Sequence, residues 1–136
     1  MADITNRDEI FRKDKLVQVY RTITEIKKGT TVKVNYRKFI YNKAIYNRGG
    51  LKCFVRDMTD SETISSGLAI DKDNIKVRFN HNDLISSDCK IIFKGKVYNV
   101  QGTPDNYNYN YRDDTVVSAT QVNDTLKYES DIFMED

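Results

Sequence analysis

Histidine, cysteine, proline and tryptophan are scarce in this chain of 136 residues, which has one histidine, two cysteines, one proline and no tryptophan. One histidine and two cysteines leave too little material for most metal sites and for most catalytic pairs of a nucleophile and a histidine. No run approaches about 18 apolar residues, so the sequence predicts no transmembrane helix. The segment Met1–Lys15 alternates acids and bases without an apolar core, which argues against a secretory signal.

Sequence motifs for catalysis, cofactors or metals are also missing. Cys53 and Cys89 lie far apart and form no CxxC unit, so we expect reduced thiols on or beneath strands. His81 follows a predicted strand and is interpreted as a turn residue. No Gly-rich phosphate loop, HExxH or GxSxG occurs. The sequence therefore predicts no enzyme, and it assigns no catalytic residue, cofactor or metal.

Short alternating runs of β-branched, aromatic and polar residues dominate the chain instead. Period-two alternation is typical of strands with one buried face. The predicted strands are 16–26, 30–41, 51–58, 74–79, 89–93, 96–100 and 115–122. Lys94–Gly95 separates two of them and predicts a tight hairpin. The helical signal is weaker: Thr59 or Asp60 as an N-cap, followed by Glu62, predicts one or two turns.

Six or seven strands at spacings of roughly ten residues indicate a small barrel or sandwich. The predicted fold class is mainly β, a small antiparallel β-barrel with one or two short helical turns and flexible termini. Residues 1–122 are assigned to a single β-barrel domain with a long loop at 42–50. Residues 123–136 are assigned to a mobile acidic C-terminal tail, with Tyr128, Ile132 and Phe133 as candidates for docking on a partner.

Charge is distributed unevenly along the chain, although 22 bases nearly balance 20 acids. From Lys27 to Arg56 there are nine bases and no acid, whereas residues 59–136 hold eight bases and fourteen acids. Two interpretations stay open. The basic stretch forms the solvent face of strands that pair with acids elsewhere, or it faces a polyanion whose binding weakens with salt. Aromatic residues among the bases, such as Tyr36, Phe39 and Tyr41, suit either a core or a surface that stacks on single-stranded nucleic acid.

Candidate site residues follow from the second interpretation. The candidates for contact with DNA are Lys33, Arg37, Lys38, Lys43, Arg48 and Lys52. The segment 42–50 is long for a connection between two strands and ends in Gly49–Gly50. Within it, a loop that reaches a ligand or gates a pore would consist of Ala44, Ile45, Tyr46 and Asn47.

One stretch carries a resemblance to a known family. Asn74–Pro104 contains Val77–Arg78–Phe79, a polar turn, a strand over Lys90–Phe93, the turn Gly95–Lys96 and the unit Tyr98–Asn99–Val100. In this order the pieces resemble the head closure proteins of long-tailed bacteriophages, also called stoppers or head–tail connectors. The segments 60–69 and 112–121 are similar to the family's polar helical segment and closing strand, so the resemblance covers roughly residues 51–122.

The resemblance implies a structural virion protein in the phage neck, located at the head–tail interface and assembled in the host cytoplasm. It implies a small β-barrel that forms a ring with itself, of about twelve copies by family resemblance. Its other partners would be a portal or adaptor protein, a tail terminator or tail protein, and packaged double-stranded DNA, with no membrane. The alternatives are an OB-like barrel that binds single-stranded nucleic acid, and a neighbouring neck protein, either an adaptor or a tail terminator.

Overall fold

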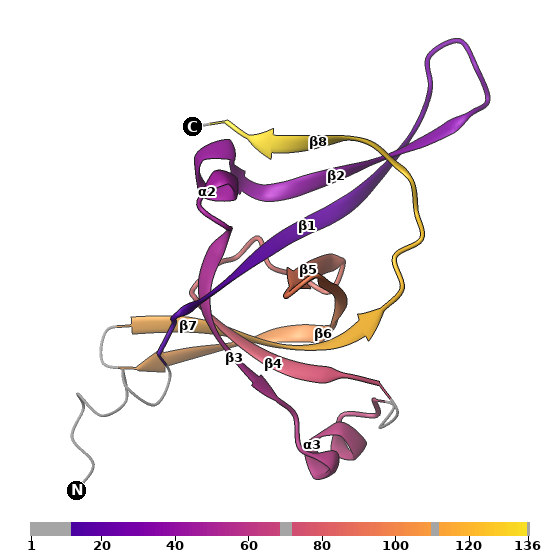
Figure 1. Cartoon of the computed structure of the whole chain (residues 1–136). Coiled ribbons are helices and arrows are strands. Elements are labelled where there is room, and N and C mark those ends of the chain that lie inside the picture. The colour runs from indigo at the N-terminus through magenta and orange to yellow at the C-terminus, as the bar shows by residue number, and fades with distance from the viewer. Residues whose placement is uncertain (1–11, 69–71, 110–111, 136) are drawn as a thin grey trace, which may run out of the picture.

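The computed structural model describes residues 12–68, 72–109 and 112–135, and within these ranges the chain is mainly β (Figure 1). The elements in chain order are β1 (Lys15–Ile26), β2 (Lys33–Asn42), α2 (Lys43–Asn47), β3 (Leu51–Asp57), α3 (Asp60–Ser65), β4 (Asn74–Asn80), β5 (Cys89–Phe93), β6 (Lys96–Tyr109), β7 (Arg112–Val122) and β8 (Tyr128–Met134). The mainly β prediction is confirmed.

Six of these strands form a closed ring of hydrogen-bonded neighbours. The order is β3, β4, β7, β6, β5 and β1, and β1 pairs again with β3. Each pair in the ring is antiparallel. Closure depends on the length of β1, since Lys15–Val17 pair with β3 and Gln18–Arg21 pair with β5. The ring is barrel-like, as the spacing of the strand patterns predicted.

The buried side chains form one apolar cluster. Among its members are Val17 and Val19 of β1, Phe39 of β2 and Phe79 of β4, each at most 1% exposed. Both cysteines are buried here as free thiols, as the sequence predicted. Burial raises the pKa of the Cys53 thiol to about 12, so this sulfur stays protonated and packs as a small apolar group.

Local sequence signals predict two further features of the fold. Thr59 caps α3 through a capping box, in which its side chain accepts a hydrogen bond from the Glu62 amide and the Glu62 carboxylate accepts one from the Thr59 amide. Lys94 and Gly95 form the β5–β6 turn with φ values of 51° and 77°. Both signals depend on neighbouring residues only, which is why the sequence reveals them.

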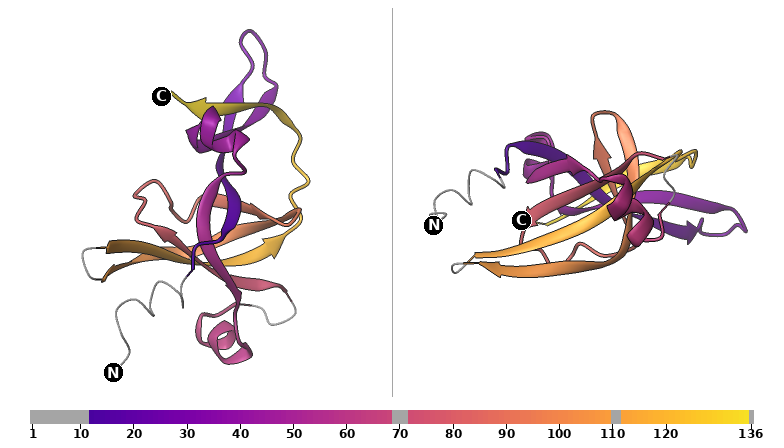
Figure 2. Two further views of the ribbon diagram at one scale, coloured as in Figure 1. Left: turned by 60° about the vertical axis from the view of Figure 1, so that its left-hand side comes forward. Right: turned by 90° about the horizontal axis from the view of Figure 1, so that it is seen from below.

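The sheet continues beyond the ring through β2 and β8. β2 pairs with β1 in antiparallel orientation, and β8 lies parallel to β2 as the last strand of the sheet. Figure 1 and the left view of Figure 2 show that the hairpin between β1 and β2 projects past the rest of the sheet, while α3 lies at the opposite end of the molecule. The single parallel pair departs from the predicted all-antiparallel arrangement.

The prediction of a mobile C-terminal tail is wrong for Tyr128–Met134, because these residues form β8. Phe133 stacks on Phe39 with 5.3 Å between ring centroids, and it meets Tyr46 at 4.9 Å. Arg37 forms an ion pair with Asp131 of β8 at 2.8 Å. Acids interrupt the alternating pattern of this segment. It is a strand because its backbone pairs with β2, which lies far away in the sequence.

Asp124 anchors the connection that leads into β8. Its Oδ2 atom accepts hydrogen bonds from the hydroxyls of Tyr20 at 2.7 Å and Tyr128 at 2.5 Å, and Lys90 lies 3.5 Å away. Burial by itself would raise the pKa of Asp124, but the hydrogen bonds from the two tyrosines outweigh it and lower the pKa. The carboxylate therefore ties β8 to β1 and β5.

Replacing Asp124 by alanine is expected to release β8 before the rest of the sheet. The buried Tyr20 hydroxyl would lose its acceptor, which costs about 1–3 kcal/mol. Hydrogen–deuterium exchange should then show faster exchange in 128–134 than in the ring strands. Thr125→Ala is the matched control, since Thr125 is an exposed neighbour. Equal protection of β8 in both variants would contradict the anchoring role.

The long loop predicted at 42–50 is also wrong in part, because Lys43–Asn47 form the short helix α2. The Asn42 side chain caps this helix by accepting a hydrogen bond from the Ile45 amide at 3.0 Å. Tyr46 packs edge-on against Phe39 with 4.9 Å between ring centroids. A segment fastened at its start and through its aromatic ring is not a free loop, so the structure does not support a gating role for it.

The remaining gating candidates also belong to this short helix. Ile45 is half-buried against the core, whereas Ala44 and Asn47 are exposed on the outer side of the helix. At the other end of the helix, the Gln18 side chain donates a hydrogen bond to the Tyr46 carbonyl at 3.0 Å. This contact ties the end of α2 to β1.

Candidate nucleic-acid interface

Most of the positive charge of the acid-free stretch 27–56 has no ion-pair partner among the described residues. Of its nine bases, only Arg37 and Arg56 form ion pairs with carboxylates of the described residues. The seven bases without such a partner in the described ranges are all exposed: Lys27, Lys28, Lys33, Lys38, Lys43, Arg48 and Lys52. Within those ranges, the interpretation in which this stretch pairs with acids elsewhere in the fold therefore applies to two of the nine bases.

Arg37 was predicted to contact DNA, and in the structure its guanidinium has partners within the chain. Its guanidinium donates to Asp131 through Nε at 2.8 Å and lies over the rings of Tyr20 and Tyr128 at 5.7 Å and 5.4 Å from their centroids. The arginine is thus held between β8 and β1 by charge and by cation–π contacts. The acid that pairs with it is 94 positions away in the sequence, so no local pattern announced it.

Arg56 is the second base of the stretch whose charge is paired with a carboxylate. Its two terminal nitrogens each donate to a carboxylate oxygen of Glu62 at 2.7 Å. The hydrogen bonds from Arg56 are the largest cause that lowers the pKa of Glu62 to about 2. This bidentate pair fastens α3 to the end of β3.

Three of the unpaired bases lie on the hairpin that joins β1 to β2. We call residues 26–33 the arm; it projects beyond β8 (Figures 1 and 2). Its turn is closed by a hydrogen bond from the Lys27 amide to the Val32 carbonyl at 2.8 Å and by one from the Thr30 amide to the Lys27 carbonyl at 3.0 Å. Ile26 and Val32 are 64% and 56% exposed. The arm thus presents Lys27, Lys28 and Lys33 on a hydrogen-bonded hairpin.

Two further bases without an ion-pair partner in the described ranges follow along the chain. Lys38 is exposed on β2, next to buried Phe39, and Lys43 is exposed at the first position of α2. Both were predicted to contact DNA, and both are accessible for such contact. They extend the positive surface from the arm towards α2.

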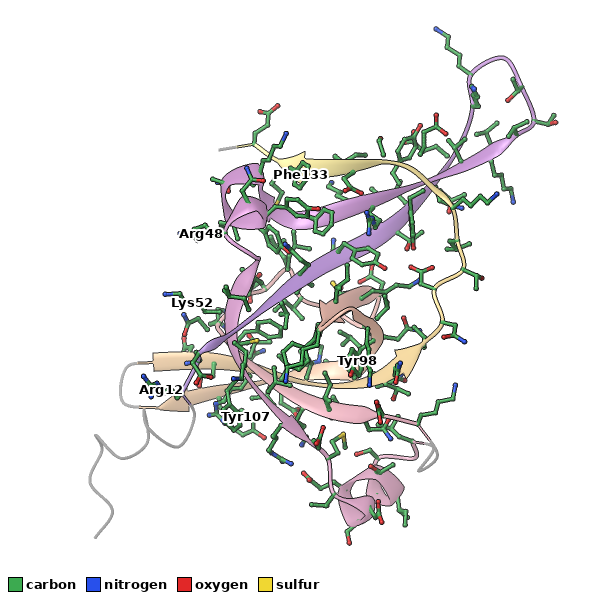
Figure 3. The ribbon with its side chains drawn as sticks, viewed as in Figure 1. Arg12, Arg48, Lys52, Tyr98, Tyr107 and Phe133 are labelled. Atoms are coloured by element: carbon green, nitrogen blue, oxygen red, sulfur yellow. The ribbon has the colours of Figure 1, made fainter. Side chains whose placement is uncertain are left out.

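Arg48 and Lys52 line one cleft of about 530 Å³, together with Leu16, Gly50, Leu51, Phe79, Asn80, His81 and Asn82. Arg48 is the residue after α2, and Lys52 lies on β3 directly opposite Leu16 of β1. Figure 3 shows Arg48, Lys52 and Arg12 following one another down the same side of the molecule. The structure therefore brings together two of the six predicted DNA-contact residues and adds lining residues that the charge pattern did not indicate.

The residues predicted to dock on a partner are mostly occupied by the chain itself. Tyr128 bonds to Asp124 and packs edge-on against Tyr20 with 6.0 Å between ring centroids, and Phe133 stacks on Phe39. Ile132 is 37% exposed, on the outer side of β8. Of the three candidates, only Ile132 presents an accessible apolar side chain.

The aromatic residues among the bases do not form a stacking surface. Phe39 and Tyr41 are 1% and 4% exposed. The Tyr41 hydroxyl donates to the Gln18 side chain and accepts from the Val19 amide at 2.8 Å. Side chains committed to the core are not available to stack on bases, so this structure removes the basis for single-strand binding through Tyr36, Phe39 and Tyr41 as a set.

Acids and lysines occur together near α3. A second cavity, of about 410 Å³, is lined by three exposed aspartates and three exposed lysines: Asp57, Asp60, Asp73, Lys72, Lys94 and Lys96. Lys96 of this cavity pairs with Asp73 at 3.0 Å. The end of the molecule at α3 therefore has mixed charge, whereas the arm at the opposite end carries lysines without a partner among the described residues (Figure 2).

Sequence reasoning missed the roles of Gly50, Asp114 and Asp124. Gly50 lines the cleft, Asp114 accepts hydrogen bonds from Lys13 and Arg78, and Asp124 anchors the connection to β8. Gly49–Gly50 carried a usable signal, because a glycine pair after a helix often means a positive φ. Asp114 and Asp124 carried none, since their partners lie on other strands.

Neither the protein-family models nor the curated proteins compared with this sequence give a match, so function must be inferred from the residues of the chain itself. In the described ranges neither helix has the length and apolar character needed to cross a membrane.

Proposed function

We propose that this protein is a structural component of the neck of a long-tailed bacteriophage, a head closure protein. Copies of the chain form a ring between the portal or adaptor protein and the tail, close the DNA-filled capsid and line part of the DNA channel. The resemblance of Asn74–Pro104 to that family and the barrel-like ring of six strands support this proposal.

The observation that carries the proposal is the unpaired charge of the acid-free stretch. Seven exposed bases with no ion-pair partner in the described ranges repel one another unless a polyanion or counterions surround them. DNA phosphates meet this requirement without base-specific contacts, because binding releases condensed counterions. A channel that conducts DNA of any sequence needs this kind of contact.

The uneven distribution of the bases also suits assembly into a ring. In a closed ring each copy presents two different surfaces to its two neighbours. The lysines of two arms repel each other, which opposes pairing of arm with arm and favours contact between different surfaces of neighbouring copies. We expect single contacts to be weak and the closed ring to gain strength from simultaneous contacts.

The test is assembly of the purified chain, alone and with a portal or adaptor protein. We expect mass photometry and negative-stain microscopy to show rings. A chain that stays monomeric with every neck partner, and that binds short single strands more tightly than duplexes, would overturn the proposal in favour of single-strand binding. Rings that join only a tail tube would assign the chain to the neighbouring position of tail terminator.

The lysines of the arm give a quantitative prediction. Replacing Lys27, Lys28 and Lys33 by glutamine should reduce the slope of log binding constant against log salt for duplex DNA by about 2.7, or about 0.9 for each phosphate that a lysine no longer neutralises. The matched control replaces Lys72, Lys94 and Lys127, exposed lysines outside the acid-free stretch. Titrations at several salt concentrations measure both slopes. Equal slopes for the two triple variants would exclude the arm from the DNA contact.

A further inference from the structure

One cleft lies between the end of α2, the start of β1 and the β3–β4 pair. It combines basic and apolar residues, whereas attraction to DNA by charge needs only the bases. Its volume of about 530 Å³ lies within the range of small-molecule sites. We propose that this cleft binds a phosphate group carried by a nucleotide, either a free nucleotide or one link of a nucleic-acid strand.

Among the described residues, the lining of the cleft carries positive charge and no acid. Arg48 and Lys52 both reach the cleft, and none of the lining residues in the described ranges is an aspartate or a glutamate. Neither side chain has a hydrogen bond or an ion pair with a described residue. Arginine offers paired donors that match phosphate oxygens, and lysine adds a point charge.

Part of the lining of the cleft is apolar. Leu16 is 43% exposed and is the cross-strand neighbour of Lys52, and Leu51, the residue before Lys52, is half-buried. Phe79 closes the floor and is almost fully buried. A bare inorganic anion would leave this apolar part exposed to water, whereas the sugar or base of a nucleotide would cover it.

Polar groups at the rim complete the site. Asn80 is the last residue of β4, His81 and Asn82 follow it, and all three line the cleft. The backbone here is fixed, because the His81 amide donates to the Asp113 carbonyl at 2.9 Å and the Asn82 amide donates to the Thr115 hydroxyl at 3.1 Å. The His81 imidazole lies 2.8 Å from the Asp83 carboxylate, whereas the side-chain amides of Asn80 and Asn82 are donors of the kind that bind phosphate or the edge of a base.

The cleft is held in shape before any ligand arrives. Arg48 follows α2, whose end is tied to β1 by Gln18, and the Gly50 amide donates to the Ile45 carbonyl at 3.0 Å. Little ordering of the backbone is then needed for binding, which favours affinity.

For a nucleic-acid strand, this inference rests on the proposed function, because the strand would be the packaged DNA. For a free nucleotide it stands independently. A free nucleotide and a strand would place the same phosphate group in the cleft, but only the strand would continue beyond it. On that path Arg12 adds a further positive charge on the same side of the molecule in Figure 3.

The test follows backbone amide shifts by NMR while the full-length protein is titrated with a deoxynucleoside monophosphate, the nucleoside without phosphate, inorganic phosphate and a short DNA duplex. We expect the monophosphate to shift the amides of Gly50, Lys52 and His81 and the nucleoside not to. The double variant R48Q/K52Q should bind about tenfold more weakly or worse, because it removes both charge-assisted interactions with the phosphate. The double variant K94Q/K127Q, at exposed lysines away from the cleft, is the matched control.

The outcomes separate the sources and the rival ligands. Shifts with the duplex but not with the monophosphate identify a strand as the source, and shifts with both identify a general nucleotide site. Unchanged affinity in R48Q/K52Q, or shifts confined to other strands, would overturn the proposal, and so would an acidic peptide that fills the cleft when no phosphate probe does. Ring formation by R48Q/K52Q, measured separately, shows whether a failure concerns the cleft or the neck function.

Discussion

Of all glycine-to-alanine replacements in this chain, Gly50→Ala is expected to destabilise the fold most. Gly50 has a φ of +108°, and a Cβ atom placed there would lie 1.9 Å from the carbonyl oxygen of Val17 and 2.6 Å from its carbonyl carbon. These are backbone atoms of β1, held by pairing with β3 at the point where the ring closes. They cannot move aside as a flexible side chain would.

We expect the Gly50→Ala variant to lose more than about 4 kcal/mol of unfolding free energy, the range reached when a backbone clash and strain combine. Urea unfolding followed by circular dichroism measures the loss. If the variant does not fold, the soluble yield and the loss of strand signal give the same answer. The cleft would be lost with the fold, so this variant tests architecture and not binding.

Two other glycines make the comparison quantitative. A Cβ at Gly49 (φ +107°) would meet the tip of the Leu16 side chain at 3.0 Å, and a Cβ at Gly29 (φ +77°) would meet nothing within 4 Å. Gly29→Ala should cost about 1–2 kcal/mol, the strain of a left-handed conformation alone. Gly49→Ala should fall between the others, since a leucine side chain can shift. A Gly50→Ala variant as stable as Gly29→Ala would show that the β1 backbone does not approach Gly50 closely.

The second large effect is expected for Asp114→Asn. Asp114 of β7 is 7% exposed and accepts hydrogen bonds from Lys13 at 2.8 Å and from Arg78 at 2.6 Å. Asparagine keeps the shape of the side chain but removes the charge that both cations face. Removing one partner of a buried ion pair costs about 3–5 kcal/mol, because the remaining charge is left uncompensated. Thermal and urea unfolding at neutral pH measure the loss.

The same carboxylate predicts how stability depends on pH. Burial alone would raise the pKa of Asp114, but the hydrogen bonds from Lys13 and Arg78 outweigh it, so the pKa lies below its ordinary value of 3.8. The folded protein then binds this proton less tightly than the unfolded chain does. The contribution of Asp114 is therefore fully present well above pH 3.8 and is lost as the pH falls below that value. The difference in stability between the wild type and Asp114→Asn should shrink over the same range.

The control for Asp114 is a carboxylate at the surface that contacts a histidine. Asp83 lies 2.8 Å from the His81 imidazole, and its side chain is 86% exposed. Asp83→Asn should change stability by less than about 1 kcal/mol, as exposed pairs usually do. Two results would contradict this role: a similar loss of stability in the two variants, or an Asp114→Asn difference that stays constant down to low pH. Either would show that the contacts of Asp114 with Lys13 and Arg78 do not stabilise the fold as expected.

Local patterns predicted the strands of the ring well because each strand has one buried face. Ile75, Val77 and Phe79 alternate with polar residues, and all three are buried on β4 as expected. β6 is the exception in length. It continues past Val100 to Tyr109, because β7 pairs with Val97–Gln101 and, after a register shift, again with Asp105–Tyr109. Pairing with a neighbour extended the strand further than alternation indicated.

The candidate site was predicted in part. The acid-free stretch identified the exposed lysines of the arm, and it also identified Arg48 and Lys52. It did not distinguish them from Arg37, whose charge is neutralised by Asp131 of a segment that was predicted to be mobile. Aromatic residues among the bases were equally ambiguous, and burial of Phe39 and Tyr41 resolved them as core.

By itself the sequence determined that the chain is mainly β, where its α3 cap and β5–β6 turn lie, and that its bases are concentrated between Lys27 and Arg56. These features depend on composition and on residues close to one another in the chain. Only the tertiary structure decided that β8 completes the sheet, that two of those bases are paired, and that Arg48 and Lys52 share a cleft with Leu16 and His81. The reason is physical: burial, ion pairing and cleft formation depend on contacts between strands far apart in the chain, and a local pattern carries no record of which residues will meet.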